Sequence, residues 1–164
     1  MKKALLSLLL LSLFLLSGCV SQTGGENAYD VYFLTRESGQ EAALAAERRT
    51  LSPEEDVVEG LLNSLLSGPS EEGLLRTIPD GVTLRGWTLE NGLLTVDFSS
   101  RYGSLSGIAL TLADYSVVLT LTQLDTVDTV MITAEGDLLS YRDHQRLTAA
   151  DVQSELLPLE EDQK

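Results

Sequence analysis

The stretch from Asp114 to Gly136 carries the hydrophobic pattern around which the domain is expected to be built. In the first half of this stretch apolar residues fall on nearly every side of a helix with 3.6 residues per turn, which predicts a helix buried on most sides. The second half, Thr129 to Ala134, is rich in β-branched residues and predicts a strand covered on both faces. A buried helix that leads into a buried strand places this stretch at the centre of a small domain.

Two strands are predicted near the start of the domain. Within Tyr29 to Arg36, the residues from Val31 to Leu34 are all apolar, and this blurred alternation suits an interior strand. Leu44 to Leu51 follows a polar turn, and Arg48 and Arg49 mark it as an edge strand or a partly exposed one.

A helix is predicted to begin at Ser52-Pro53-Glu54-Glu55, which has the pattern of a capping box. The serine hydroxyl can accept the Glu55 amide, and proline suits the first helical position because no hydrogen bond is lost there. From Val57 to Leu66 apolar residues recur at three- and four-residue spacing, which forms a stripe typical of packing on a core. Gly68 and Pro69 end the helix.

A β-hairpin is predicted where Val82 to Glu90 and Leu93 to Ser99 flank the dipeptide Asn91-Gly92, because both residues of a type I′ turn need positive φ. This loop pairs Glu90 with Leu93, Leu89 with Leu94 and Trp87 with Val96. The buried face then holds Trp87, Leu89, Leu94, Val96 and Phe98. Continuing this register would turn Arg85 toward the core and Leu84 toward solvent, so we expect a bulge near Gly86 that corrects the alternation.

The remaining segments carry weaker patterns. Arg101 to Gly107 predicts a loop of small residues that leads into the long buried helix. After Gly136, the segment Asp137 to Arg142 can return as a hairpin, and Thr148 to Asp151 can cap a short helix that reaches about Leu156. Glu160 to Lys164 is acidic and is expected to be disordered.

These elements together predict an α+β protein with a single small domain at residues 29–140. Its mostly antiparallel sheet carries two helices packed on one face, in the approximate order β-β-α-β-β-α-β. Residues 141–164 form a C-terminal segment with the acidic tail. One modest domain is all that 164 residues accommodate beside the ends of the chain.

The charge of the chain limits its partners. Eleven basic residues stand against 25 acidic ones, which gives a net charge of -14 at pH 7. Such a surface repels phosphate groups, so we expect no nucleic acid partner and no attraction to bare anionic lipid. The even spread of the acids favours a solvated surface over a site for one basic partner.

The N-terminal segment has the pattern of a secretory signal. Lys2 and Lys3 precede a run from Ala4 to Leu16 that is apolar except for Ser7 and Ser12 and is too short for a membrane span. It ends in Leu16-Ser17-Gly18-Cys19, which resembles the bacterial lipobox. The resemblance implies that residues 1–18 are a signal peptide, that Cys19 carries diacylglycerol and an acyl chain such as palmitate, and that 19–28 form a lipidated tether. The alternative is an ordinary signal peptide with a chance cysteine.

Lipidation of Cys19 would place the domain on the extracytoplasmic face of the bacterial cell membrane. Two or more acyl chains anchor a protein far more firmly than one does. Cys19 is the only cysteine, so no thiol remains for a disulfide or for redox chemistry.

Several motifs resemble those of the GerMN domain, a module of sporulation and spore germination proteins. Two of them lie in the central stretch: the helix end Val118 to Leu124, and the strand Val127 to Ile132 with Ala134-Glu135-Gly136 after it. After the first predicted helix come Gly68-Pro69, Gly73-Leu74 and Ile78-Pro79-Asp80-Gly81. The second strand of the predicted hairpin ends in Val96-Asp97-Phe98-Ser99. The resemblance covers about Tyr29 to Gly136. It implies a membrane-anchored binding or assembly module in sporulation, germination or the cell envelope, similar in fold to ring-building domains. Some relatives carry two such domains, and the one found here argues against ring or channel assembly.

No catalytic constellation is visible in the sequence, so we expect no enzyme, cofactor or metal. The segment Gly103 to Gly107 has leucine where a nucleophile elbow needs serine. His144 is the only imidazole and stands in a polar stretch, which excludes a two-histidine metal site. Acid pairs such as Asp125 with Asp128, or Glu71 with Glu72, are expected on loops or solvent faces. Asp97 is expected to bind amides at the end of its strand rather than to catalyse.

Two other functions stay open beside a protein-interaction module. A lipoprotein that binds a small solute or a cell-wall fragment would be favoured by a pocket lined by Trp87, Tyr102 and Tyr115, although core packing also explains these aromatic residues. An envelope hydrolase would need carboxylates clustered in a cleft.

Overall fold

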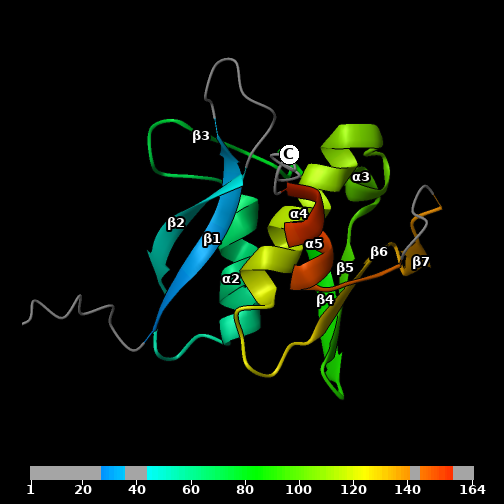
Figure 1. Ribbon diagram of the computed structural model, residues 1–164. Coiled ribbons are helices and arrows are strands. Elements are labelled where there is room, and N and C mark those ends of the chain that lie inside the picture. The colour runs from blue at the N-terminus through cyan, green and yellow to red at the C-terminus, as the bar shows by residue number, and fades with distance from the viewer. Residues whose placement is uncertain (1–26, 36–43, 141–144, 157–164) are drawn as a thin grey trace, which may run out of the picture.

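The structure is a computed structural model that describes residues 27–35, 44–140 and 145–156 of the chain (Figure 1). The predicted signal peptide, Cys19, most of the tether, His144 and the acidic tail lie outside the described residues. The elements are β1 (Ala28–Thr35), β2 (Leu44–Thr50), α2 (Val57–Ser67), β3 (Leu74–Leu75), β4 (Leu84–Glu90), β5 (Leu93–Phe98), α3 (Ser100–Gly103), α4 (Gly107–Leu121), β6 (Thr129–Ala134), β7 (Asp137–Leu138), β8 (Arg146–Leu147) and α5 (Ala149–Leu156).

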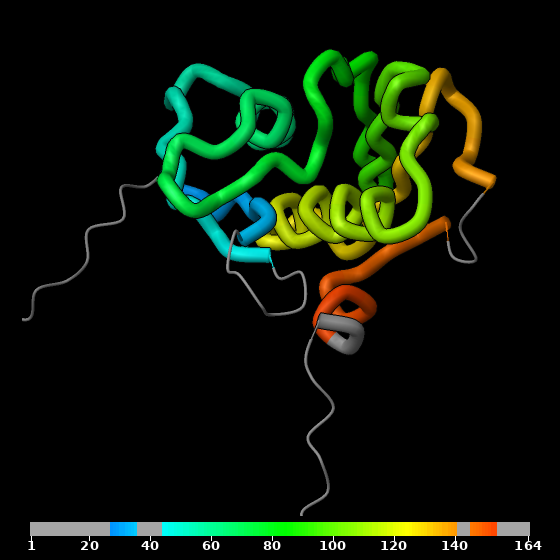
Figure 2. Tube along the Cα trace, turned by 90° about the horizontal axis from the view of Figure 1, so that it is seen from above, coloured from blue at the N-terminus to red at the C-terminus, as the bar shows by residue number. Residues whose placement is uncertain are grey.

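The predicted α+β class and the order of the main elements are confirmed, but the strands form two sheets rather than one. A three-stranded sheet has the order β2-β1-β3, and a five-stranded sheet has the order β4-β5-β6-β7 with β8 also paired to β6. The described pairs are antiparallel except the parallel pair β5–β6. Figures 1 and 2 show α2 and α4 between the sheets, so both sides of the apolar α4 are covered.

The predicted hairpin and its bulge are both confirmed. Asn91 and Gly92 have φ angles of 50° and 81°, as a type I′ turn requires, and the three predicted cross-strand pairs are present. The register shifts between Leu84 and Gly86. On the predicted buried face the β5 residues are fully buried, whereas Trp87 and Leu89 of β4 are only partly buried and pack against the core. The difference arises because β4 lies at the edge of its sheet.

Helix α2 begins later than the capping box predicts. The Asp56 side chain is the cap and accepts the amides of Val58 and Glu59 at 3.0 Å each. Ser52 and Glu55 instead close a turn through a backbone hydrogen bond of 3.1 Å. An aspartate one residue before the apolar stripe therefore displaces the serine as the cap, because its carboxylate satisfies two amides at once.

The predicted loop at Arg101 to Gly107 is wrong in its first part, which belongs to the short helix α3. Tyr102 is completely buried, and its ring stacks on that of Phe98 with centroids 4.7 Å apart. Its hydroxyl donates to Asp114 at 2.7 Å. Burial of this one aromatic side chain draws the chain into a helical turn directly after β5.

The last elements agree with the prediction. Strand β7 returns antiparallel to β6, with Ala134 opposite Asp137. Thr148 and Asp151 cap α5 reciprocally, because each accepts the other's amide through its side chain. The buried Val152 belongs to the core, and α5 packs on α4.

Side chains of α4 and of the turn that follows it satisfy backbone groups of β1 along the edge that β2 does not cover. Ser116 donates to the carbonyl of Tyr32, and Thr120 accepts the Tyr32 amide at 3.1 Å. Gln123 accepts the Asp30 amide at 3.0 Å and donates to the Asp30 carbonyl at 2.7 Å. Ser116 and Thr120 lie on one side of α4 at four-residue spacing, and Gln123 follows in the turn directly after the helix. Together they replace a neighbouring strand for this part of β1.

The substitution Thr120→Val tests this replacement, because it keeps the shape of the side chain but leaves the Tyr32 amide without its acceptor. We expect the free energy of unfolding to fall by about 1 to 3 kcal/mol. The control is Thr111→Val on the same helix, whose hydroxyl bonds only to Gly107 of its own helix. Urea denaturation measures both, and equal losses in the two variants would contradict this role for Thr120.

A second substitution tests the hairpin. A Cβ at Gly92 would lie 2.1 Å from Asp128 Oδ2, whereas one at Gly73 would meet nothing within 4 Å. Both glycines have positive φ, so alanine carries the same backbone strain of about 1 to 2 kcal/mol at each. Thermal unfolding should therefore show a larger loss of stability for Gly92→Ala than for Gly73→Ala. Similar losses for the two variants would contradict this, because they would mean that Asp128 moves away from the added methyl group without loss of stability.

Candidate functional site

A cluster of charged side chains lies where the end of β5 meets the end of β6. Arg85 Nη1 is 3.0 Å from Asp97 Oδ2 and 3.2 Å from Glu135 Oε2. All three side chains are partly exposed to solvent, which screens the ion pairs and limits their contribution to stability. The cluster joins β4, β5 and the turn after β6.

Asp97 acts in this cluster as a brace between two strands. Its Oδ1 accepts the Gly136 amide and the Thr133 hydroxyl, each at 2.8 Å. Asp97 therefore binds a backbone amide as predicted, but the amide is that of Gly136, in the turn after the adjacent strand and 39 positions away in the chain. Each carboxylate oxygen of Asp97 has a donor within the fold.

The turn between β6 and β7 places Glu135 in an unusual backbone conformation. Glu135 and Gly136 have φ angles of 57° and 83°, which makes a two-residue turn of the I′ type. A non-glycine residue with positive φ is strained. The Glu135 amide donates to Phe98 at 2.9 Å, and its carboxylate accepts the Ser100 amide at 2.9 Å, so surrounding contacts hold the residue in place.

A shallow open pocket of about 340 Å³ lies beside this turn. Ser100 and Gly103 of α3 form one wall, and residues between Ala134 and Ser140 form the other. Leu138 on its rim is 53% exposed. The size is at the lower end of small-molecule sites, and the pocket is open to solvent rather than enclosed.

A second charged pair is buried, on β2. Glu47 is only 2% exposed, pairs with Arg49 and accepts the amides of Ser70 and Glu71 at 2.7 and 3.0 Å. Burial alone raises the pKa of the Glu47 carboxyl, but these amides and the guanidinium outweigh it and hold the pKa below its ordinary value of 4.5. Arg49 also donates to the Gly68 carbonyl at 2.8 Å. Together the pair fixes the loop after α2 onto the three-stranded sheet.

The side chains of the two acid pairs named in the sequence analysis point to solvent, although the backbone amide of Glu71 donates to Glu47. Glu71 and Glu72 are exposed, as expected of a loop, and so are Asp125 and Asp128. The backbone amide of Asp128 donates to Gly92 at 2.8 Å, so this residue supports the tip of the hairpin. The sequence analysis missed Glu47 with Arg49, although their two-residue spacing places both on one face of a strand.

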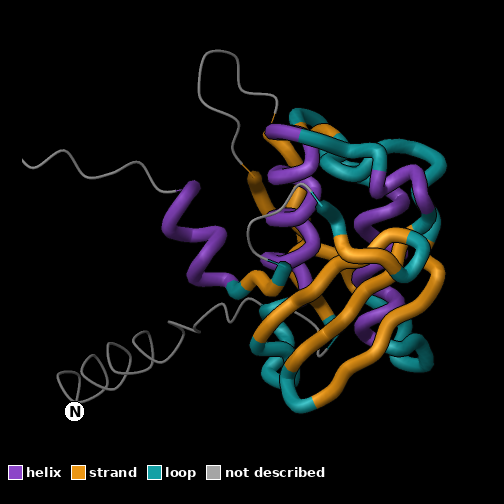
Figure 3. The backbone as a smooth tube through the Cα atoms, turned by 90° about the vertical axis from the view of Figure 1, so that its right-hand side faces the viewer, coloured by secondary structure: helices purple, strands orange, loops and turns teal. Residues whose placement is uncertain are grey.

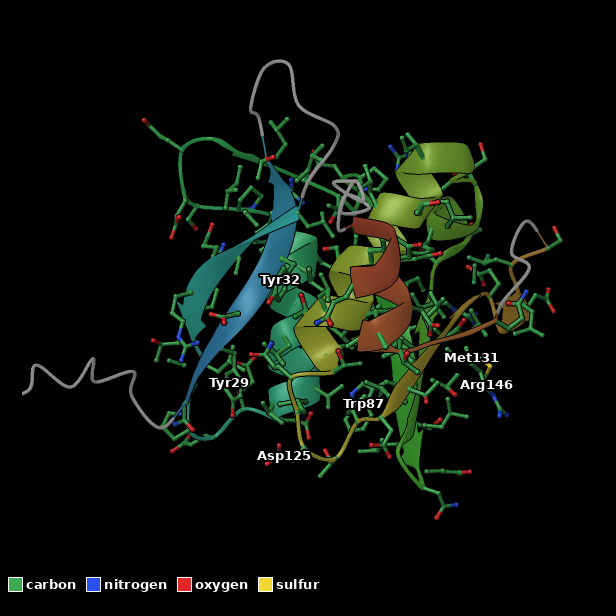
Figure 4. All side chains as sticks on the ribbon, in the orientation of Figure 1. Tyr29, Tyr32, Trp87, Asp125, Met131 and Arg146 are labelled. Atoms are coloured by element: carbon green, nitrogen blue, oxygen red, sulfur yellow. The ribbon has the colours of Figure 1, made fainter. Side chains whose placement is uncertain are left out.

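The three aromatic residues considered for a pocket do not share one environment. Tyr102 and Tyr115 are buried in the core, with 0% and 7% of their surface exposed. Trp87 is partly exposed on the side of the sheet that faces the helices, whereas Met131 and Arg146 lie on its other side (Figure 4). Core packing thus accounts for both tyrosines.

Two features are absent from the part of the chain that the structure describes. No group of three or more histidine, cysteine, aspartate or glutamate side chains suited to a metal ion occurs within residues 27–35, 44–140 and 145–156. In the same part of the chain, no helix has the length and apolar character needed to cross a membrane.

Comparison with solved structures identifies the class of domain. The tandem GerMN domains of the sporulation protein GerM from Bacillus subtilis match with a TM-score of 0.59 and 27% identity, over 71% of this chain and 43% of that chain. The first GerMN domain of the same protein matches with a TM-score of 0.64 and 20% identity, over 76% of this chain and 98% of that chain. The fold is therefore that of a GerMN domain, and the chain spans less than half of the tandem structure.

The sequence profile of the Germane family, described as "Sporulation and spore germination", matches residues 30–140. This match covers more than half of the chain, and the protein belongs to that family. The resemblance stated from the sequence motifs is thereby confirmed. A search of curated proteins finds no match.

Acid titration tests the buried pair. Since the Glu47 pKa is lowered in the folded state, its contribution to stability is complete above about pH 4.5 and is lost as the pH falls through the folded pKa. Glu47→Gln should destabilise the protein by about 1 to 3 kcal/mol at pH 7 and reduce the loss of stability between pH 5 and 3. Urea denaturation across this range measures both effects. Glu72→Gln, an exposed neighbour in the same loop, is the control, and identical pH profiles would contradict the assignment.

Proposed function

We propose that this protein is a lipid-anchored, extracytoplasmic module that binds other proteins without catalysis, in sporulation, germination or a related cell-envelope process. The observation that carries the proposal is the family match over residues 30–140. The similarity to GerM of Bacillus subtilis, which is described as a sporulation protein, supports the same process.

The engagement of the charged residues supports a role in binding rather than catalysis. Asp97 and Glu135 brace the turn after β6, and Glu47 fixes the loop after α2. A general acid or base needs a carboxylate that can exchange a proton with a substrate. These carboxylates are instead held by backbone amides and arginine side chains of the fold.

The position of the tether supports anchoring close to the membrane. Strand β1 begins at Ala28, and the Asn27 carbonyl accepts the Leu51 amide at 3.0 Å, so the described chain is fixed to the domain from its first residues. From Cys19 to Asn27 an extended chain spans only about 30 Å. A lipid on Cys19 would therefore hold the domain within reach of other proteins of the membrane surface.

The anchor is tested by Cys19→Ala, which removes the thiol that receives the lipid. We expect the full-length protein to move from the membrane fraction to the soluble extracytoplasmic fraction, with loss of metabolic labelling by palmitate. Ser21→Ala in the tether keeps the cysteine and serves as the control. Membrane retention and palmitate labelling that persist in Cys19→Ala would contradict lipidation at this residue.

The interaction role is tested by crosslinking in intact cells followed by affinity purification and mass spectrometry. Reproducible enrichment of particular envelope or sporulation proteins, reduced in the Cys19→Ala variant, is the expected result. Co-purification of wall fragments or a small molecule with no protein would instead support the alternative of a solute-binding lipoprotein.

A further inference from the structure

Strand β4 is an open edge of the five-stranded sheet. It pairs with β5 on one side and is the first strand in the sheet order. Figure 3 shows the strands of this sheet facing the viewer with helices behind them. In a hairpin with a two-residue loop, Glu90 bonds to Leu93, so the backbone groups of Leu89 and Trp87 point away from β5. Within the described part of the chain, no hydrogen-bond partner is found for these outward groups.

The open stretch has definite limits. The bulge between Leu84 and Gly86 interrupts the edge at one end, and the Asn91-Gly92 turn ends it at the other. Proteins commonly block exposed edges with lysine, proline or inward-pointing charge. From Trp87 to Leu89 the sequence contains none of these. This part of β4 therefore remains free to pair with another extended chain.

The side chains along the edge would contact an added strand on both faces. Trp87 and Leu89 lie on the face toward the core and are partly exposed, because no strand covers their outer side. Thr88 and Glu90 alternate with them on the opposite face and are exposed. A matching strand would thus carry apolar residues on one face and polar residues on the other.

Charge determines which strand fits. Glu90 is exposed on β4 next to the open stretch, and Asp128 lies against Gly92 at the tip of the hairpin. At the other end, Arg85 is shared by Asp97 and Glu135, which leaves an excess of negative charge there as well. A second copy of this chain would bring another net charge of -14 against the same surface. A basic segment would instead be attracted to it.

We propose that β4 binds an extended, basic segment of a partner protein as an additional strand of the five-stranded sheet. The backbone of Trp87 and Leu89 supplies the hydrogen bonds, apolar residues of the segment cover these two side chains, and its lysine or arginine residues approach Glu90. This inference rests on the proposed function, because it names the chemistry of the partner that the module would bind.

A defined peptide tests the inference with the full-length protein in detergent micelles. The probe is Lys-Val-Lys-Ile-Lys-Val, and the matched peptide has glutamate in place of each lysine. Trp87 is the only tryptophan, so its fluorescence reports directly on the edge. The basic peptide should shift this fluorescence saturably, with binding that weakens as salt is added. No saturable shift with the basic peptide, or an equal shift with the acidic one, would overturn the proposal.

Peptide methylation tests the hydrogen bonds without altering the protein. Two copies of the basic peptide carry N-methyl groups on alternate amides, one set at the lysines and the other at the apolar residues. Only one edge of an added strand faces β4, so one copy should lose binding and the other should retain it. Equal binding by both copies would mean that backbone pairing is not involved.

Protein variants connect the peptide to the residues of β4. Leu89→Pro should abolish the fluorescence shift, because it removes an N–H that would bond to the peptide. The domain should still fold, because proline is accepted on the open side of an edge strand. Glu90→Lys should weaken binding by roughly tenfold, whereas Glu72→Lys, with the same charge change elsewhere, should weaken it far less. Circular dichroism verifies that each variant is folded.

Two further outcomes separate this inference from the proposed function. Partner proteins that still co-purify with a folded Leu89→Pro variant would overturn the role of β4 but leave the interaction module intact. A dimer seen by sedimentation and lost in Leu89→Pro would assign the edge to a second copy and also overturn the inference.

Discussion

The contact on which the fold depends is the set of hydrogen bonds from α4 and the turn after it to the backbone of β1. An apolar helix between two sheets could slide or rotate, because apolar packing alone is non-directional. Ser116, Thr120 and Gln123 remove this freedom, since each must meet a particular amide or carbonyl of Asp30 or Tyr32. The same bonds protect the backbone of β1 where β3 does not reach it. These three side chains thus fix the position of the helix and also close the open edge of β1 in the three-stranded sheet.

With α4 fixed, charged residues secure the loops around it. Glu47 and Arg49 attach the loop after α2, and Asp97 attaches the turn after β6. Both carboxylates accept backbone amides far away in the chain, so they define which loops lie together. The domain consequently presents one braced end of the five-stranded sheet and one free edge at β4, and these two regions differ in what they can offer a partner.

Sequence patterns predicted the elements whose signals are local. The Asn91-Gly92 hairpin, its register and the bulge near Gly86 follow from turn chemistry and alternation, and the structure agrees. The division into two sheets was not predictable in this way, because strand order depends on contacts between distant segments. The helical turn at Tyr102 was missed because the residues around it have loop character, whereas the tyrosine is buried against Phe98 and donates to Asp114 of α4. The edge at β4 became recognisable only when its place in the sheet was known.

The parallel pairing of β5 with β6 has a consequence for the order in which the chain can fold. The β4–β5 hairpin forms from neighbouring residues, whereas Phe98 meets Ala134 only after the intervening segment with α3 and α4 has been brought back across the sheet. Such non-local pairing is slow because the entropy of closing the intervening chain opposes it. Until then β5 exposes an unpaired and mostly apolar edge, so a newly made chain passes through a stage at which it is most prone to aggregate.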